Sequence, residues 1–353
     1  MSYAVIGVIA RASHGAQAMT VQTRATLDDV AKLAGVSAKT VSRVYAQREK
    51  VSAETVERVL SAAKRLRFRP NSLARSLRRG GPSKTIGFIM GELLNPFYYG
   101  IAAGIERELA AHGSPLIVAT TDDSPDGEEH VADALLAQRV GALLMIPVGD
   151  DQSYLEGERQ LGTPVIAIDR PARNLVADAV VLENRAGART ATTALLTQGH
   201  REIAYVCNPA SVYTQLERVQ GYRDALRDAG IAVDGRREVL LDDMSLPLED
   251  TVRELLCAAD APTAIVAGNN RACVAALRAM RGLRHPPALI GFDDFDTADV
   301  LGVSVIAHDP VEMGRTAARL ALERMADPAG FTTRVELPTW LIRRGSGERP
   351  PER

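Results

Sequence analysis

The sequence has few of the residues that form disulfides, metal sites and cofactor sites. Only three cysteines occur in 353 residues, namely Cys207, Cys257 and Cys273. Their odd number and wide spacing exclude a disulfide framework and favour buried free thiols in a reducing compartment. Six histidines are scattered along the chain, and no G-x-G-x-x-G, Walker A, G-x-S-x-G or H-E-x-x-H motif occurs. The sequence therefore predicts no metal, no cofactor and no enzyme activity.

Long hydrophobic runs are also lacking. No apolar run approaches the ~18 residues that span a bilayer, so no membrane partner is predicted. Residues 1–24 contain a seven-residue apolar core, Ala4 to Ala10, but no basic residues precede it as they do in a secretory signal. We interpret this extension as disordered, or as an over-long start with Met19 as the initiator. The predicted location is the cytoplasm.

The chain has almost no net charge, at −2, but its charges are unevenly distributed. Residues 24–84 carry 15 lysines and arginines against 5 acidic residues, a net charge of +10. The remaining 27 basic and 39 acidic residues give the rest of the chain a net charge of −12. A small basic block joined to a larger acidic body is typical of a nucleic-acid-binding head on a soluble module.

Three short helices are predicted in the basic block. Thr26 is an N-cap, and the first helix ends at Gly35. Ser37 caps a second helix over AKTVSRVYA, and Ser52 caps a third over AETVERVLSAAKRLRF. Two helices joined by a tight glycine-containing turn form a helix-turn-helix, whose second helix enters the major groove. On spacing alone, a basic pair of solvated surface helices remains the alternative.

The second helix has one basic face. Lys39 and Arg43 are four residues apart and share that face, whereas Val41 and Val44 point toward the core. Lysine and arginine bind guanine O6 and N7, and the small Ala38 suits a thymine methyl group. Hydroxyls and backbone N–H groups at helix N-termini donate hydrogen bonds to phosphate oxygens. The candidate DNA-binding residues of the three helices are Thr26, Ser37, Ala38, Lys39, Thr40, Ser42, Arg43 and Ser52.

After the third helix the pattern changes twice. Gly80, Gly81 and Pro82 break the chain and indicate a linker. From Thr85, apolar strands alternate with amphipathic helices in two successive series, which predicts parallel sheets covered by helices on both faces. Two series predict two doubly wound lobes, and such sheets bind ligands at the carboxyl ends of their strands.

The segments TLDDVAKLAGVSAKTVSRV and VSAETVERVLSAAKRLRFRPNSLARSLRRG resemble the head and hinge of the lactose-repressor (LacI) family of transcription regulators over about 55 residues. The resemblance implies a homodimer on a pseudo-palindromic double-stranded DNA operator. It implies base reading by Ala38, Lys39 and Arg43. Where the family usually has asparagine, this chain has Ala46, which leaves a phosphate contact there in doubt.

The same resemblance implies a hinge helix over residues 71–79. Asn71 and Arg75 would contact DNA, and Leu77 would be the apolar wedge that unstacks and kinks base steps in the minor groove. Leu73 and Leu77 are spaced i, i+4, so an ordinary amphipathic dimer seam remains the alternative.

The body resembles the family's effector domain, which is related to periplasmic sugar-binding proteins. The matching pieces are NPFYYG, AIDRP, ERVQGYRDAL, IVAGNNRA and ALIGFDDFDTAD. In the family these converge on a cleft between two lobes. The residues implied as effector contacts are Asn95, Phe97, Tyr98, Asp169, Arg170, Arg218, Asn269 and Asp293, with His308 where the ribose-like branch often carries an amide.

This residue set is suited to a polyol. Carboxylates and amides accept hydrogen bonds from hydroxyls, arginines donate them, and aromatic rings cover the C–H face of a sugar. A pentose is favoured over a hexose, and a ribonucleoside fits the same polar set. Two positions stay open: His308 is either a ligand contact or a crossover residue, and Arg218 either binds ligand or pairs with Glu217 or Asp224.

The sequence thus predicts an α + α/β chain with a small all-helical helix-turn-helix head and a two-lobed, periplasmic-binding-protein-like body of doubly wound parallel sheets. The predicted segments are an extension (1–24), the helix-turn-helix domain (25–69), hinge helix and linker (70–84), the effector-binding and dimerisation domain (85–346) and a disordered tail (347–353). Lobe 1 is expected over about 85–182 and 310–337, and lobe 2 over about 183–308 and 338–346.

The predicted function is that of a sequence-specific transcription regulator, expected to be a repressor, whose operator affinity is controlled by a small polar effector in the cleft. Two alternatives remain on sequence grounds. One is a sugar-binding transport protein, and the other is an α/β enzyme that acts on a sugar.

Overall fold

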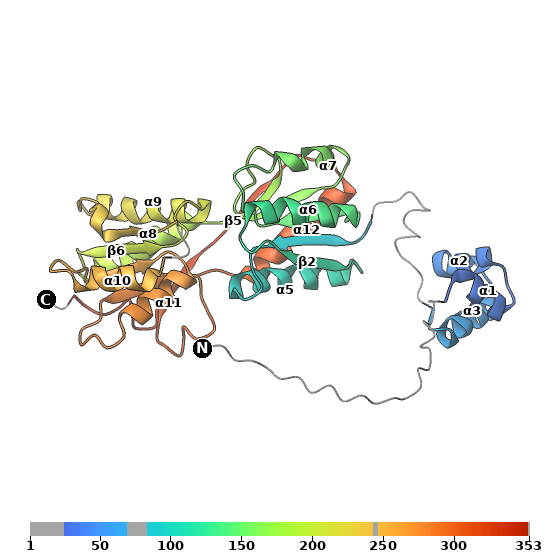
Figure 1. The fold of residues 1–353 in the computed structure, drawn as a ribbon, viewed down its shortest axis with the longest axis horizontal. Coiled ribbons are helices and arrows are strands. Elements are labelled where there is room, and N and C mark those ends of the chain that lie inside the picture. The colour runs from blue at the N-terminus through green and yellow to red at the C-terminus, as the bar shows by residue number, and fades with distance from the viewer. Residues whose placement is uncertain (1–24, 69–82, 243–245, 352–353) are drawn as a thin grey trace, which may run out of the picture. The chain divides into compact units, whose positions relative to one another are not determined.

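The computed structural model describes residues 25–68, 83–242 and 246–351. The chain divides into two compact units between Gly81 and Pro82, inside the stretch expected to be a linker. Figure 1 shows both units, which are described separately below. The extension 1–24 and the hinge positions Asn71, Arg75 and Leu77 lie outside the described residues.

The head unit consists of three helices around a small core (Figure 1, blue). These are α1 (Leu27–Ala34), α2 (Ala38–Ala46) and α3 (Ala53–Arg65), with a 3-10 turn, η1 (Arg48–Lys50), before α3. Helix α3 ends earlier than its apolar pattern predicts. Arg67 has a φ of 50°, and the N–H of Phe68 bonds to the carbonyl of Ala63 at 2.9 Å. This left-handed turn closes the helix.

The first lobe of the body is built on a parallel sheet in the order β11-β5-β4-β3-β1-β2. Its strands are β1 (Ile86–Met90), β2 (Leu116–Thr120), β3 (Ala142–Met145), β4 (Val165–Asp169), β5 (Asp178–Leu182) and β11 (Arg334–Leu337). Helices α5 (Pro96–Ala111) and α12 (Pro310–Ala326) pack together on one face. Helix α6 (Pro125–Ala137) packs on β1 and β2 from the opposite face, beside η2 (Ser153–Leu155) and α7 (Glu156–Gln160) (Figure 1).

The second lobe repeats this design with the order β12-β10-β9-β8-β6-β7. Its strands are β6 (Ile203–Cys207), β7 (Glu238–Leu240), β8 (Ala264–Ala267), β9 (Ala288–Phe292), β10 (Ser304–Ala307) and β12 (Trp340–Ile342). Only β12 runs antiparallel within this sheet, beside β10. Helices α8 (Asn184–Thr197) and α9 (Tyr213–Asp228) pack together on one face, and α10 (Leu248–Cys257) and α11 (Asn270–Ala279) pack together on the other; η3 (Gly235–Arg237) precedes β7. The predicted fold class is confirmed.

Glycines let paired helices approach to backbone contact. A Cβ on Gly104 of α5 would lie 2.0 Å from the carbonyl oxygen of Val311, and one on Gly314 of α12 would lie 2.1 Å from that of Ile101. Distances this short are forbidden to real atoms, so the α5–α12 pair depends on glycine at both positions. Because α12 follows lobe 2 in sequence, this close pair fixes a late segment of the chain to lobe 1.

The prediction of three buried thiols is wrong for one of them. Cys207 and Cys273 are buried, but Cys257 is exposed. Cys257 is the last residue of α10, whose final turn is partly or fully exposed. The apolar string around this residue reflects one buried stripe of the helix rather than burial on all sides.

The expected disordered tail is wrong for residues 347–349. Ser304 Oγ donates to a carboxylate oxygen of Glu348 at 2.8 Å and lies 3.3 Å from the backbone nitrogen of Gly347. The ring Nε2 of the buried His200 lies 2.8 Å from the carbonyl oxygen of Arg349. These bonds attach the tail to the second lobe.

Candidate functional site

The head helices begin at the hydroxyl caps that the sequence predicts. The Oγ1 of Thr26 accepts from the N–H of Asp29 at 3.3 Å, and the Asp29 carboxylate accepts from both the N–H and the hydroxyl of Thr26 at 2.8 and 2.7 Å. This capping box holds the pKa of Asp29 below its usual range. Ser37 and Ser52 accept from the N–H three residues on, at 3.1 and 3.4 Å. Because these hydroxyls are engaged, the free first-turn N–H groups are the groups left for phosphates.

Gly35 makes the turn between α1 and α2. Its φ of 65° and ψ of 38° are left-handed, and its N–H bonds back to carbonyls of the last turn of α1. The N–H of Val36 also bonds to the Ala31 carbonyl, at 3.0 Å. Glycine adopts this conformation without steric cost, so the turn directs α2 away from α1 at a fixed angle.

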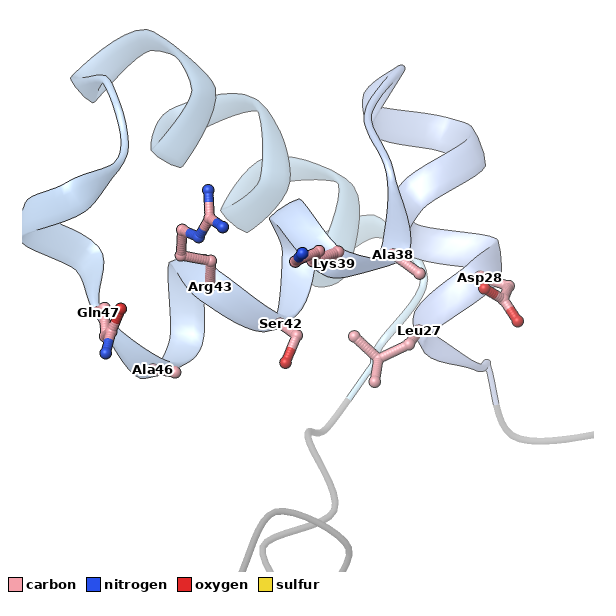
Figure 2. A pocket seen from close by; sticks show the side chains of 8 residues that line it. All are labelled: Leu27, Asp28, Ala38, Lys39, Ser42, Arg43, Ala46 and Gln47. Carbon is pink, nitrogen blue, oxygen red and sulfur yellow. The ribbon is translucent and has the colours of Figure 1, made fainter. Parts of the chain in front are cut away.

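Helix α2 presents a polar outer face. Lys39, Ser42 and Arg43 are exposed, whereas Val41 and Val44 are buried beneath them. This face forms one side of a groove of about 540 Å³ between α1 and α2. Figure 2 shows the side chains that line the groove. The groove is lined by Leu27, Asp28, Ala38, Lys39, Ser42, Arg43, Ala46 and Gln47.

Four of the eight predicted head residues line the groove, namely Ala38, Lys39, Ser42 and Arg43, whereas the three helix caps and Thr40 do not. One further residue of the groove was missed. Thr40 does not line the groove, and its hydroxyl lies 2.9 Å from that of Ser37. Ala46, where the resemblance leads one to expect asparagine, does line it. Gln47 is the missed residue, although its spacing of four from Arg43 could have indicated it. A glutamine amide can pair with adenine N6 and N7, so Gln47 adds a possible base reader to this face.

A second candidate site is a cleft of about 320 Å³ in the body, between the two lobes. It lies at the carboxyl ends of strands from both sheets, where doubly wound folds bind ligands. Eight predicted residues line it: Asn95, Phe97, Tyr98, Asp169, Arg170, Arg218, Asn269 and Asp293. The ninth, His308, is not among the lining residues.

Arg218 of α9 is held by three groups of the second lobe. Its Nε donates to Oδ1 of Asn184 and its Nη1 to the carbonyl of Gly268, both at 2.7 Å. Its Nη2 lies 3.4 Å from Oδ1 of Asp293, and its guanidinium lies 3.6 Å from the centre of the Phe292 ring. The open question of a pairing with Asp224 or Glu217 is thereby answered, because Arg218 pairs with Asp293 instead.

Asp169 and Asp293 occupy equivalent positions in the two lobes, at the ends of β4 and β9, and both have a φ of 68°. Burial raises the pKa of Asp169, and the 3.4 Å contact with Arg170 does not offset that effect. Burial acts in the same direction on Asp293, but Arg218 and His308 outweigh it and hold the pKa of Asp293 below its usual range. Equivalent positions in the two lobes therefore carry one carboxyl whose pKa is raised, Asp169, and one whose pKa is lowered, Asp293.

Replacing each of these carboxylates with its amide is expected to shift stability in opposite directions. A carboxyl whose pKa is raised by folding stabilises the protein only at low pH, and that contribution is lost as the pH rises through the folded-state pKa. At pH 7 the Asp169 carboxyl thus destabilises the folded protein relative to a neutral side chain, so Asp169→Asn should raise the Tm by a few degrees. The contribution of Asp293 is present above its ordinary pKa and lost as the pH falls through the depressed value, so Asp293→Asn should lower the Tm.

Thermal melts of both variants at pH 7 and pH 3 test this expectation. The two shifts should differ in sign at pH 7 and shrink at pH 3. Asparagine tolerates a positive φ, so backbone strain does not enter the comparison. Shifts of the same sign at pH 7 would contradict the assignment of opposite pKa directions.

Three of the predicted side chains form hydrogen bonds to other groups of the protein. Oδ1 of Asn95 accepts from the N–H of Phe97 at 3.1 Å and so caps α5. Asn269 caps α11 through Oδ1, and its Nδ2 donates to the carbonyl of Asn208 at 2.7 Å, so both ends of this amide are engaged. His308 lies behind the cleft, with Nε2 at 3.1 Å from Oδ1 of Asp293 and its ring edge-on to Phe97. His308 therefore orients Asp293.

Contacts cross directly from lobe to lobe around the cleft. Nδ2 of Asn270 donates to Oδ1 of Asn95 at 3.0 Å, and the hydroxyl of Tyr99 donates to Oδ2 of Asp296 at 3.2 Å. Glu92 and Arg271 form an ion pair between the same two lobes. Polar groups that border the cleft thus connect the two lobes in the arrangement seen here.

Two protein-family models match the chain, one over the head and one over the body. Residues 26–71 match the family model described as bacterial regulatory proteins, lacI family. Residues 83–321 match the model described as periplasmic binding proteins and sugar binding domain of LacI family. The chain belongs to the LacI family. Its role as a DNA-binding transcription regulator, predicted from the sequence, is confirmed.

Individual LacI-family relatives align over nearly the whole chain. The ribose operon repressor of Haemophilus influenzae is 31% identical, over 90% of this chain and 98% of that protein. Among solved structures, the transcriptional regulator CelR–cellobiose complex is 30% identical over 92% of this chain and all of that one, with a TM-score of 0.67. The lac repressor dimer bound to operator and the anti-inducer ONPF has a TM-score of 0.81 at 26% identity, over 93% of this chain and all of that one.

These LacI-family matches decide between the sequence alternatives. The relatives are named as repressors and transcriptional regulators, so neither the transport protein nor the sugar-converting enzyme finds support. A ribose operon repressor among them agrees with the predicted likeness to the ribose-like branch. In the part of the chain that the structure describes, no helix is both long enough and apolar enough to span a membrane.

The LacI-family cleft contains polar residues that the sequence analysis missed. They lie after the ends of β2, β6, β7 and β8, so their position beyond the carboxyl ends of predicted strands is the signal that could have found them. The missed polar residues are Asp123, Asn208, Ser211, Thr214, Gln215, Asp242, Asn270 and Arg271. Gln215 is already engaged, because it accepts from the hydroxyl of Tyr205 at 3.0 Å and donates to the carbonyl of Gly268 at 3.0 Å.

Proposed function

We propose that this regulator is a cytoplasmic, nucleoid-associated repressor that binds a pseudo-palindromic operator as a homodimer and responds to a neutral sugar in the cleft. The observation that carries the proposal is the pair of buried carboxylates, Asp169 and Asp293, each with an arginine beside it at the meeting point of the lobes. Carboxylates accept from hydroxyls and arginines donate to them, which is the set a polyol requires. A pentose or ribonucleoside is favoured.

The proposed DNA contacts are divided between bases and phosphates. Ala38, Lys39 and Arg43 read base edges with Ser42 and Gln47 beside them, because these residues form the outer face of α2. The helix N-termini at Thr26, Ser37 and Ser52 face phosphates. Thr40 supports the N-terminus at Ser37, because its hydroxyl lies next to that of Ser37. Asn71, Arg75 and Leu77 are proposed as hinge contacts on the strength of the family resemblance.

Homodimer formation is supported by an uncovered strand edge. Strand β2 is the outermost strand of its sheet, and Ile117 and Val118 on it are exposed. Edge strands of monomeric proteins are normally protected by charge or by short length, whereas this one presents apolar side chains. The relative solved on its operator is a dimer.

Control of DNA binding follows from linkage. The cleft takes residues from both lobes, so a ligand that contacts both favours one lobe arrangement over others. If that arrangement differs in operator affinity, ligand and operator change each other's affinity by the same factor, typically about 5- to 150-fold.

The test is fluorescence anisotropy with an operator selected from random duplex DNA, with and without each of a panel of sugars. One sugar is expected to change operator affinity by a factor in that range, and the operator should change sugar affinity equally. A sugar that binds without altering operator affinity would contradict the proposal, as would chemical turnover of the sugar.

A further inference from the structure

Lysine and arginine are distributed differently along this chain. The chain has five lysines, and all of them lie within residues 32–84. Residues 85–353 contain 26 arginines and no lysine. A reaction specific for the lysine amine can therefore modify side chains of the head and of the first residues of the body, but no side chain beyond residue 84.

The need for positive charge does not explain why the head contains lysine. Ten arginines accompany the five lysines over residues 24–84, so arginine is accommodated there as well. In the body, where arginine is the only strong cation, it forms buried ion pairs such as that of Arg324 with Asp178. The two side chains differ in reactivity, because arginine stays protonated whereas the lysine amine is a target of acyl transfer. Lysine thus gives the head a reactivity that the lobes lack.

The lysine side chains are accessible to a reagent. The five residues, all exposed, are Lys32, Lys39, Lys50, Lys64 and Lys84. Within the described residues, none of these lysines forms an ion pair or a side-chain hydrogen bond. Lys39 is the one of the five that lines the groove on the outer face of α2, as Figure 2 shows. Modification of Lys39 therefore changes the face that is proposed to read base edges.

We propose that Lys39 is an acylation site through which operator binding is weakened independently of the effector. The unprotonated Nζ of Lys39 attacks the carbonyl carbon of an acyl phosphate or an acyl thioester. An amide C–N bond forms, the C–O or C–S bond of the donor breaks, phosphate or thiol leaves, and the proton of the amine passes to water. The reaction transfers an acyl group and needs no oxidant or reductant.

The product is suited to switching DNA binding without affecting the lobes. Acylation replaces the cation by a neutral amide with a single N–H group. Arg43 is then the remaining cation among the residues that line the groove, and the donors that suit guanine O6 and N7 are reduced. The effector-binding residues include no lysine, so the response to sugar is not modified directly. This inference rests on the proposed contact of Lys39 with base edges.

The distribution of lysine allows a sharp test on the full chain. Replacing four lysines by arginine (Lys32→Arg, Lys50→Arg, Lys64→Arg and Lys84→Arg) leaves Lys39 as the single lysine. A lysine-free variant adds Lys39→Arg and serves as the matched control, because both proteins keep the same N-terminal amine. Each protein is incubated with acetyl phosphate in one arm and with acetyl coenzyme A in the other, which distinguishes the two classes of donor.

Peptide mass spectrometry locates the acetyl group, and fluorescence anisotropy measures binding to the selected operator before and after treatment. Acetylation of the single-lysine variant at Lys39 should weaken operator binding roughly 5- to 150-fold relative to the untreated sample. The lysine-free variant should keep its own affinity after the same treatment. Operator added before the donor should protect Lys39 from acetylation. The chain isolated from its native host should carry an acyl group on Lys39.

Three results would overturn the acylation site. They are unchanged operator affinity after full acetylation of Lys39, an equal loss of affinity in the lysine-free variant, and the absence of acyl-Lys39 from the chain isolated from its native host. A separate measurement distinguishes failure of the underlying DNA contact. If untreated Lys39→Ala binds operator as tightly as the unmodified chain, the proposed base contact fails, and the acylation switch fails with it.

Discussion

Arg218→Ala is expected to lower the free energy of unfolding by about 3–5 kcal/mol, because it leaves a buried partner charge uncompensated. The side chain is 3% exposed and bonds to Asn184, the Gly268 carbonyl and Asp293. Within the described part of the chain, its removal leaves His308 as the remaining side-chain partner of the buried Asp293 carboxylate, and the Phe292 ring loses the cation stacked on it. The same change should abolish the effect of sugar on operator binding, since the cleft would lose a guanidinium that is proposed to donate to the sugar.

Urea unfolding measures the first effect, and operator anisotropy with added sugar measures the second. Arg227→Ala is the matched control on the same helix. Arg227 is largely exposed and pairs with Asp224 one turn away, so its removal should change stability by less than about 0.5 kcal/mol. Equal costs at both positions would show that Arg218 is not the centre of the second-lobe network. Arg218→Lys keeps the positive charge but loses the planar guanidinium and its several donors. This variant should therefore be more stable than Arg218→Ala while still weakening the sugar response.

Lys39→Ala is expected to weaken operator binding by about 1–3 kcal/mol, which is roughly a factor of 5 to 150, and to relax the preference at one base position. Lys39 lies near the start of α2, on the exposed face that lines the head groove. It is the cation nearest the helix N-terminus, the part of a recognition helix that reaches base edges.

Anisotropy titrations on the operator, on single-base variants of it and on random duplex DNA distinguish base reading from simple charge. Arg58→Ala provides the control, because it removes the same charge from an exposed position on α3, away from this groove. That control should affect operator and random DNA alike. Equal weakening of operator and random DNA by Lys39→Ala would show that Lys39 contacts phosphates only.

The sequence predicts the head well because its determinants are local. A hydroxyl at each helix start, Gly35 in the turn and valines on one face of α2 are all read within a few residues of each other. The end of α3 is the exception: Arg67 adopts a left-handed conformation that favours glycine or asparagine, so no sequence signal marks it.

The body is predictable as a pattern of alternating strands and helices, but its short late strands are not predictable one by one. Strands β11 and β12 join sheets whose other strands lie earlier in the sequence, and a segment as short as Trp340–Ile342 carries no periodicity of its own. The tail misled the sequence analysis for the same reason. Its polar composition indicates disorder, yet Glu348 is bound by Ser304 from 44 residues earlier.

In the cleft, residue type and strand position indicate which side chains gather, but not what each one binds. Asn269 was predicted to bind ligand; it lines the cleft, and its amide is also engaged by α11 and the Asn208 carbonyl. Asn208 was not predicted, and its side-chain oxygen is buried without a hydrogen-bond partner among the described residues. The difference between them depends on the backbone that faces each amide, which only the folded chain supplies.

The order of the strands also determines when the body can fold during synthesis. Each sheet receives an edge strand from the last part of the chain, β11 for the first lobe and β12 for the second, and His200 bonds to the carbonyl of Arg349. The first-lobe segments 86–182 therefore leave the ribosome well before the segments that complete their sheet. At about 5–20 residues per second, this interval lasts many seconds. Neither lobe is complete until both late edge strands have been translated, so the body finishes folding as one unit rather than lobe by lobe.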